Sequence, residues 1–150
     1  MIYLASDHRG YEMKEKIKQW LEETGRAYED CGPDHFDKDD DYPDFGERVG
    51  RKVAASPEHR GIVLCGSGIG IAVAANKIKG IRAGTCTTPE QAETVVIHDH
   101  INVLALSTDY VDEATNKKII DAFLGAQFSD KDRYVNRVKK VQKLENVDKS

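Results

Sequence analysis

Short runs of strand type alternate with stretches of helical periodicity along almost the whole chain. The runs expected to form strands are residues 2–5, 62–65, 81–86 and 103–106, with a weaker one at residues 27–31. Strands that alternate with helices are typical of βαβ units built around a parallel sheet. The pattern predicts an α/β protein: a single-domain, Rossmann-like three-layer sandwich with a five-stranded parallel sheet.

Between and after these runs, apolar residues recur at the spacing of a helix with one buried face. Gly25 is placed to end the first helix, and Pro43 suits the first turn of the second. Thr88 and Pro89 open a later helix with a capping box. The expected helices cover about residues 13–24, 43–53, 70–77, 88–98, 114–124 and 130–145.

Composition changes this picture little. The 150 residues are 39% hydrophobic and 32% charged, which suits one domain over residues 1–150, and the net charge is -4. That charge gives no electrostatic reason to expect a nucleic acid or an anionic membrane as partner. The N-terminal apolar run meets charge at Asp7, so it is too short for a signal peptide or a membrane span. We expect a cytoplasmic protein.

The cysteines and the acidic run do not indicate a metal. Cys31, Cys65 and Cys86 are widely spaced, with no Cys-x-x-Cys pair and no zinc-type histidine spacing. The carboxylates of residues 37–41 do not follow calcium-loop spacing. We therefore expect a reducing compartment, no metal, and a solvated loop at residues 37–41.

Ligands of a doubly wound sheet bind beyond the carboxyl ends of its strands, where the strand order reverses. Four segments follow strands in this way: residues 7–9, 65–70, 86–87 and 107–109. The glycine-rich segment Gly66–Gly70 is positioned for its backbone N–H groups to bind a negative oxygen. It is neither a Walker loop nor a dinucleotide fingerprint. The alternative is a tight glycine turn that serves only packing.

Cys65 stands immediately before this loop, where backbone N–H groups favour a thiolate that can accept a proton. The alternative is a small buried hydrophobe, the usual fate of a cysteine on a central strand. A nucleophilic role would need a histidine base, and His59 lies at the opposite end of the same strand.

Two features lie away from this edge. His98 closes a helix whose end is far from Cys65, so it is either a helix-terminal histidine or a residue that reaches the site of a neighbouring subunit. Arg133 and Arg137 stand one helical turn apart, so both can face one anion such as phosphate, or both are simply solvated.

Taken together, several motifs resemble the family of ribose-5-phosphate isomerase B and the galactose-6-phosphate isomerase subunits. The likeness runs from residue 1 to about residue 144, in the family's order and spacing. The motifs are Ser6–Gly10, Asp41–Asp44, Cys65–Gly70, Ala74–Lys77, Gly80–Ala83 and Asn102–Ala105.

The resemblance implies an isomerase of carbohydrate metabolism, in the pentose phosphate pathway, that interconverts ribose 5-phosphate and ribulose 5-phosphate through a cis-enediolate without cofactor or metal. It implies that Cys65 moves the proton between C1 and C2 and that Ser67 assists. The backbone of Gly66, Gly68, Ile69 and Gly70 would stabilise the enediolate oxygen.

The resemblance also implies a homodimer with shared active sites, which can pair further into a tetramer, and a C-terminal helix, about 130–145, at the dimer interface. His98 of the partner subunit would help to open the sugar ring, and Asp7 would handle the sugar hydroxyls. Tyr42 would border the pocket. The groups gathered around the phosphate would be His8, Arg133 and Arg137.

Two positions depart from the family pattern. Asp99 stands where asparagine usually follows the ring-opening histidine, and Asp109 stands where an arginine often contacts the phosphate. Lys131, in a segment where the family has a double glycine, is one candidate to replace the missing charge. The alternatives are an isomerase of a four- or six-carbon aldose phosphate and a non-catalytic sugar-phosphate-binding subunit.

Overall fold

The computed structural model describes residues 1–146 and confirms the α/β class. Its five strands form one all-parallel sheet in the order β2-β1-β3-β5-β4. The strands are β1 (Ile2–Ser6), β2 (Tyr28–Asp30), β3 (Arg60–Cys65), β4 (Ala83–Thr85) and β5 (Val103–Ser107). The expected domain over residues 1–150 is thus described up to residue 146, and residues 147–150 lie outside the described part.

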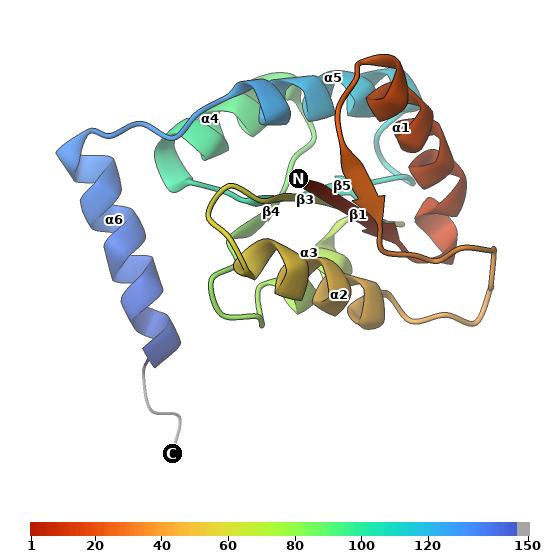
Figure 1. The fold of residues 1–150 in the computed structure, drawn as a ribbon, viewed down its shortest axis with the longest axis horizontal. Coiled ribbons are helices and arrows are strands. Elements are labelled where there is room, and N and C mark those ends of the chain that lie inside the picture. The colour runs from red at the N-terminus through yellow and green to blue at the C-terminus, as the bar shows by residue number, and fades with distance from the viewer. Residues whose placement is uncertain (147–150) are drawn as a thin grey trace.

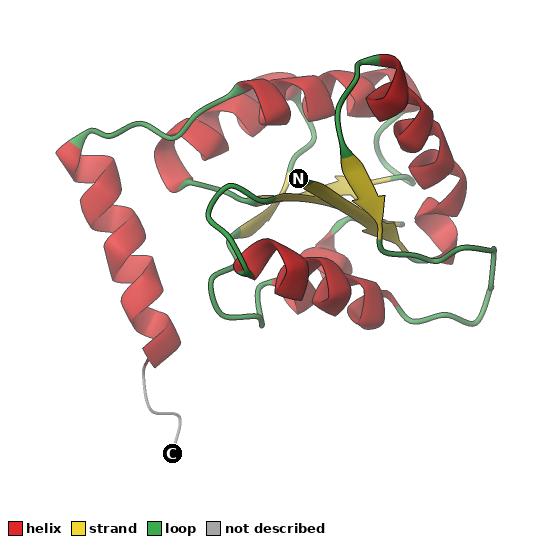
Figure 2. Cartoon of the chain, in the orientation of Figure 1, coloured by secondary structure: helices red, strands yellow, loops and turns green. Residues whose placement is uncertain are grey.

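Helices cover both faces of the sheet and make the three layers (Figures 1 and 2). One face carries α2 (Tyr42–Ala54) and α3 (Ile69–Ala75), and the other carries α1 (Tyr11–Glu23), α4 (Pro89–Asp99) and α5 (Glu113–Gly125). The helices α6 (Asp132–Lys143) and η2 (Leu144–Asn146) follow.

Two local differences from the expected elements have side-chain causes. Asp7 caps the turn η1 (His8–Gly10), which stands between β1 and α1, by accepting from the backbone N–H groups of Arg9 and Gly10. β4 begins at Ala83, not residue 81, because the Asn102 side chain accepts from the Arg82 N–H and donates to the Gly80 carbonyl. These bonds hold the chain before β4 in a turn.

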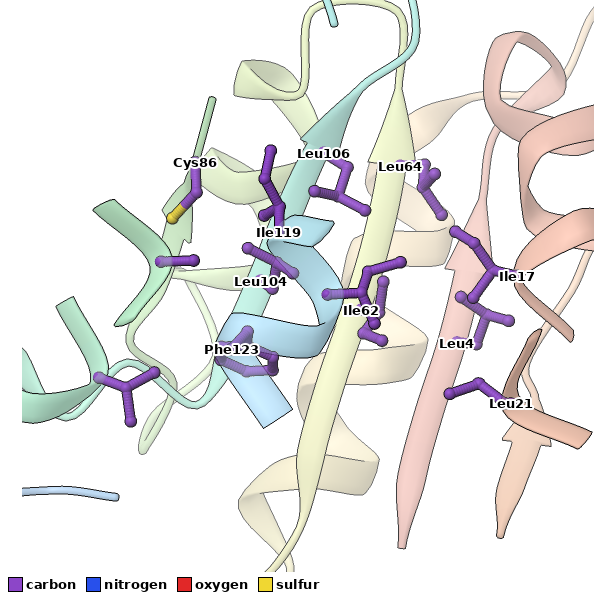
Figure 3. Packing of buried hydrophobic residues seen from close by; sticks show 13 residues of the cluster. Leu4, Ile17, Leu21, Ile62, Leu64, Cys86, Leu104, Leu106, Ile119 and Phe123 are labelled. Carbon is purple, nitrogen blue, oxygen red and sulfur yellow. The ribbon is translucent and has the colours of Figure 1, made fainter. Parts of the chain in front are cut away.

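The sheet is buried on both sides. Leu4, Ile62, Leu64, Leu104 and Leu106 point into the layer that faces α1, α4 and α5, and each is 0% exposed (Figure 3). Burying one such side chain contributes on the order of 2 kcal/mol. Continuous apolar runs are what a parallel strand covered on both faces requires.

A buried lysine fixes the segment that follows β2. Lys14 of α1 has no exposed surface, and its ammonium donates to both Asp30 carboxylate oxygens at 2.8 Å and to the Pro33 carbonyl at 2.7 Å. Lys18 adds a second ion pair to Asp30 at 3.0 Å. Helix α1 is thereby tied to the chain that leads toward α2.

Helix α6 stands away from the three layers (Figure 1). It touches α4, and the η2 turn touches the chain before β4 through Glu145, which accepts from the Gly80 N–H at 2.8 Å. Val141 and Leu144 are 52% and 66% exposed. Among the described residues, no helix is both long and apolar enough to cross a membrane.

Candidate active site

The site is built where β1 and β3 lie side by side and their chains diverge. Helix α1 leads from β1 to one face of the sheet, whereas α3 follows β3 on the other face, so the carboxyl ends of these strands form the crevice expected of a doubly wound sheet. A cavity of about 280 Å³ opens there. It is lined by Asp7, Arg9, Tyr42, Cys65, Gly66, Ser67, Gly70 and Asp109.

Cys65 is the last residue of β3 and is only 4% exposed. The backbone N–H of Gly68 donates to its sulfur at 3.2 Å. The end of β3 and the loop that follows it therefore hold the Cys65 sulfur at the wall of the cavity.

This hydrogen bond depends on glycine at position 68. Gly68 has φ +76°, a left-handed conformation that residues with a side chain rarely adopt. A Cβ there would also lie 2.9 Å from the Leu106 carbonyl carbon and 2.9 Å from the Ser107 nitrogen. Both are backbone atoms of β5 that cannot move cheaply, so the loop can close on Cys65 only without a side chain.

The rest of the loop is held by polar contacts. Ser67 Oγ accepts from the Ile69 N–H at 3.1 Å, and the Ser67 side chain remains exposed at the cavity. The Gly66 carbonyl accepts from Ser107 Oγ at 2.7 Å and from the Asp109 N–H at 3.0 Å. The loop is thus anchored to β5 before any ligand arrives.

Two side chains from other segments lie directly on this loop. A Cβ at Gly70 would come within 2.7 Å of the Tyr42 ring, and a Cβ at Gly66 would come within 2.5 Å of Arg9 Nε. Tyr42 begins α2, and Arg9 belongs to η1. Because glycine has no side chain, positions 66 and 70 allow Arg9 and Tyr42 to pack directly against the backbone of the loop.

Asp7 contributes a buried carboxyl group. It is 5% exposed, and its Oδ1 accepts from the Arg9 and Gly10 N–H groups at 3.0 and 3.2 Å. Burial raises the pKa of Asp7 above its usual value, and the hydrogen bond from Gly10 opposes that shift. The group is fixed in place by its backbone contacts while it faces the cavity.

His8 turns toward the segment before α2. Its ring Nδ1 lies 2.8 Å from Asp40 Oδ1, which also accepts from the His8 backbone N–H at 2.9 Å. The hydrogen bond to Asp40 raises the pKa of His8 above 6.5. The Phe36 ring packs edge-on against the imidazole at 6.4 Å. His8 is not among the residues that line the cavity.

The remaining expected site residues gather at α4 and α6. The His98 ring stacks on the Tyr134 ring at 4.4 Å. The Arg133 guanidinium lies 4.9 Å from the same ring and donates to the Tyr134 hydroxyl at 3.0 Å. Asp99 lines a separate hollow with Val141 and Leu144. Three cations are exposed at this helix: Arg133 and Arg137 on α6, and Lys131 directly before it.

Within one chain, then, the structure brings together Asp7, Tyr42, Cys65, Gly66, Ser67, Gly70 and Asp109, and it leaves His98, Asp99, Arg133 and Arg137 outside this cavity. The Gly68 N–H faces Cys65, and the Ile69 side chain is 55% exposed. In residues 1–146, no group of three His, Cys, Asp or Glu side chains is arranged to hold a metal ion.

Comparison with known proteins decides the family. Residues 2–141 match the profile of the Ribose/Galactose Isomerase family. The chain belongs to this family. A probable ribose-5-phosphate isomerase B of Mycoplasma genitalium is 40% identical over 145 residues, which cover 96% of this chain and 95% of the relative. The ribose-5-phosphate isomerase B of Mycolicibacterium paratuberculosis is 36% identical and covers 91% and 86% of the two chains.

Solved structures of family members agree with the fold. The Mycoplasma genitalium ribose-5-phosphate isomerase B with bound ribulose-5-phosphate superposes with a TM-score of 0.93, at 38% identity, over 98% of this chain and 97% of that one. The Clostridium thermocellum ribose-5-phosphate isomerase B gives 0.91 at 40% identity, over 97% of each chain.

Sequence reasoning assigned no function to two residues of this region. Arg9 lines the cavity and pairs with Asp109, and Asp40 holds the His8 ring. The sequence marks Arg9 only as a residue of a segment that follows a strand, because its partner Asp109 follows β5, which does not adjoin β1. Asp40 carried no signal, since it is one of several carboxylates in an acidic run.

Proposed function

We propose that this family member is an aldose–ketose isomerase that interconverts ribose 5-phosphate and ribulose 5-phosphate. The observation that carries the proposal is Cys65, whose sulfur accepts the Gly68 N–H at the wall of a cavity lined by polar groups. A family member of nearly the same length and fold has been solved with bound ribulose-5-phosphate, which supports the choice of substrate.

In the proposed reaction, Cys65 acts as the base on the open-chain sugar. The thiolate removes the proton from C2 of the aldose, and the electron pair moves to the C1 carbonyl to form a cis-enediolate. The thiol then returns a proton to C1, while a proton passes from the C2 hydroxyl to the C1 oxygen, and the ketose results. A positioned acid–base group contributes about 10²- to 10⁴-fold to such a step.

The glycine loop supplies the second requirement, stabilisation of the oxygen charge. Ser67 presents an exposed hydroxyl at the cavity, and the loop of residues 66–70 follows directly on the end of β3. Donors fixed before the reaction stabilise a developing oxyanion without reorganisation cost. In this proposal Asp7 accepts from the sugar hydroxyls and Tyr42 borders the substrate, which is supported by the position of both residues in the cavity lining.

The active unit in this proposal is a homodimer with shared sites. His98 of α4 and Arg133 of α6 both lie beside Tyr134, outside the chain's own cavity. Val141 of α6 and Leu144 of η2 are exposed, and α6 stands away from the three layers. A two-fold partner would cover this helix and bring His98 to Cys65 for ring opening, with Arg133 and Arg137 near the phosphate.

One observation favours a related substrate as second candidate. Asp109 places a carboxylate in the cavity, and a carboxylate repels a phosphate dianion. A four- or six-carbon aldose phosphate, which would set its phosphate at a different distance from the reacting carbons, would relieve that repulsion.

The test is turnover of four-, five- and six-carbon aldose phosphates by the purified protein and by Cys65→Ala and His98→Ala. Cys31→Ala and His59→Ala are the matched controls, because both residues lie outside the cavity lining. We expect fastest turnover of ribose 5-phosphate, lost in the first two variants and kept in the controls. Preference for another sugar would favour the second candidate, and turnover of none would leave a non-catalytic binding subunit.

Co-expression of the two inactive variants tests the shared site. In a random mixture half of the dimers are mixed, and each mixed dimer has one site with both native residues, so about a quarter of the native activity returns. If Cys65 and His98 acted within one chain, no activity would return.

A further inference from the structure

Arg9 is in contact with residues from the segments that follow β1 and β5. Its Nη2 donates to Asp109 Oδ2 at 2.5 Å, although the two residues are 100 positions apart. The Arg9 N–H donates to Asp7 Oδ1 at 3.0 Å, and the Arg9 carbonyl accepts from Thr108 Oγ1 at 3.2 Å. Arg9 is therefore held through its backbone by the ends of β1 and β5 and through its head group by Asp109.

The Arg9–Asp109 ion pair also packs closely against the glycine loop, at Gly66. A Cβ at position 66 would lie 2.5 Å from Arg9 Nε and 2.7 Å from Asp109 Oδ2. The guanidinium and the carboxylate thus lie directly against the backbone of Gly66, two residues before Gly68, whose N–H donates to the Cys65 sulfur. An arginine that merely extended into solvent would need no such clearance.

The charged residues that line the cavity indicate what Arg9 can bind. Asp7 and Asp109 line it with carboxylates, and Arg9 is the one cationic side chain among the lining residues of the described chain. The Arg9 side chain is 55% exposed, and Asp109 engages Nη2, so N–H groups of the guanidinium remain for a second partner. A planar guanidinium binds phosphate through paired hydrogen bonds.

We infer that Arg9, held over Gly66 by Asp109, binds the phosphate group of the sugar substrate. Asp109 is the positioning residue: it orients the guanidinium, and the pairing offsets the repulsion that its carboxylate would exert on the phosphate. The inference rests on the proposed function for the identity of the substrate, whereas the anion site itself follows from the charges and contacts within this chain.

The test compares Arg9→Ala with Arg26→Ala. Arg26 is a matched control because it too pairs with an aspartate across the fold, Asp121 at 3.1 Å, and it does not line the cavity. The readouts are kcat and KM for ribose 5-phosphate and the inhibition constant of inorganic phosphate, with thermal melting as a check that each variant is folded.

We expect Arg9→Ala to raise KM and the phosphate inhibition constant together, on the order of ten- to a hundredfold. The kcat at saturating substrate should change by less than about threefold, because the lost contact is made equally in ground and transition states. Arg9→Lys should recover part of the loss. Arg26→Ala should change none of these constants.

A double variant tests the part played by Asp109. With Arg9 removed, the carboxylate only repels the phosphate, so Arg9→Ala with Asp109→Ala should have a lower KM than Arg9→Ala alone. A higher KM in the double variant would show that Asp109 does not face the phosphate and would overturn its assignment.

Failure of this inference is separable from failure of the proposed function. If the protein turns over ribose 5-phosphate but Arg9→Ala leaves KM and the phosphate inhibition constant unchanged, the inference is wrong and the function stands. If no sugar phosphate is turned over, calorimetric titration with inorganic phosphate still decides it: binding that is lost in Arg9→Ala supports the anion site, and binding that is retained excludes it.

Discussion

Replacing Gly68 by alanine tests whether the loop geometry around Cys65 is dictated by packing against β5. A residue with a side chain at φ +76° costs about 1–2 kcal/mol. The new Cβ would also lie 2.9 Å from two backbone atoms at the end of β5, and such overpacking costs about 1–3 kcal/mol more. We expect Gly68→Ala to lower the free energy of unfolding by about 2–5 kcal/mol.

Gly25→Ala is the matched control. Gly25 has φ +69°, close to that of Gly68, but nothing lies within 4 Å of the Cβ it would gain. It therefore suffers only the conformational cost, about 1–2 kcal/mol. The difference between the two variants isolates the contact with β5.

Urea unfolding followed by the fluorescence of Trp20, the one tryptophan, measures both variants. A difference of about 2 kcal/mol shifts the midpoint by about 1 M at the slopes usual for a small domain. Turnover should fall in Gly68→Ala and persist in Gly25→Ala, because only the former displaces the N–H that faces Cys65 sulfur. Equal destabilisation of the two variants would refute the argument, since it would mean that the loop relaxes away from β5 without cost.

Two further changes probe the supports of the site. In Asp40→Asn the pKa of His8 should fall toward 6.5 in an NMR titration; in the native protein the pair stabilises the fold below about pH 6.5, and that contribution decreases as pH rises through the raised pKa of His8. An unchanged His8 pKa would refute the link. Lys14→Met should cost about 3 kcal/mol in urea unfolding, because it leaves Asp30 partly buried without its main partner, whereas Lys18→Met should cost about 1 kcal/mol or less. Equal losses of unfolding free energy in the two variants would contradict the argument that the buried ammonium of Lys14 is the more important partner of Asp30.

The fold was predictable because its signals are local and repeated. The apolar runs at residues 62–65 and 103–106 are continuous, as strands buried on both faces require, and the helices between strands carry their own caps and periodicity. Once the strands are parallel, the carboxyl ends must share one edge. Cys65 and Asp7 could therefore be placed together from sequence alone.

What could not be predicted depends on contacts between segments far apart in the chain. Nothing in the local sequence says that Arg9 reaches residue 109, or that His8 meets Asp40, since loop conformations decide both pairs. The position of His98 relative to the site of a partner is still harder to predict from the sequence, because it depends on how two copies of the chain meet. Pattern and propensity carry no information at that level.

The glycine loop shows why packing and chemistry were hard to separate at the sequence level. A turn built only for packing and a loop built to bind a ligand were alternatives for residues 66–70, yet each glycine contributes to both. Gly66 leaves room for the Arg9 guanidinium, and Gly70 leaves room for the Tyr42 ring. Gly68 takes a left-handed conformation against β5 and so turns its N–H to Cys65. Close packing is therefore the means by which this chain sets a thiol, a cation and an aromatic wall around one small cavity.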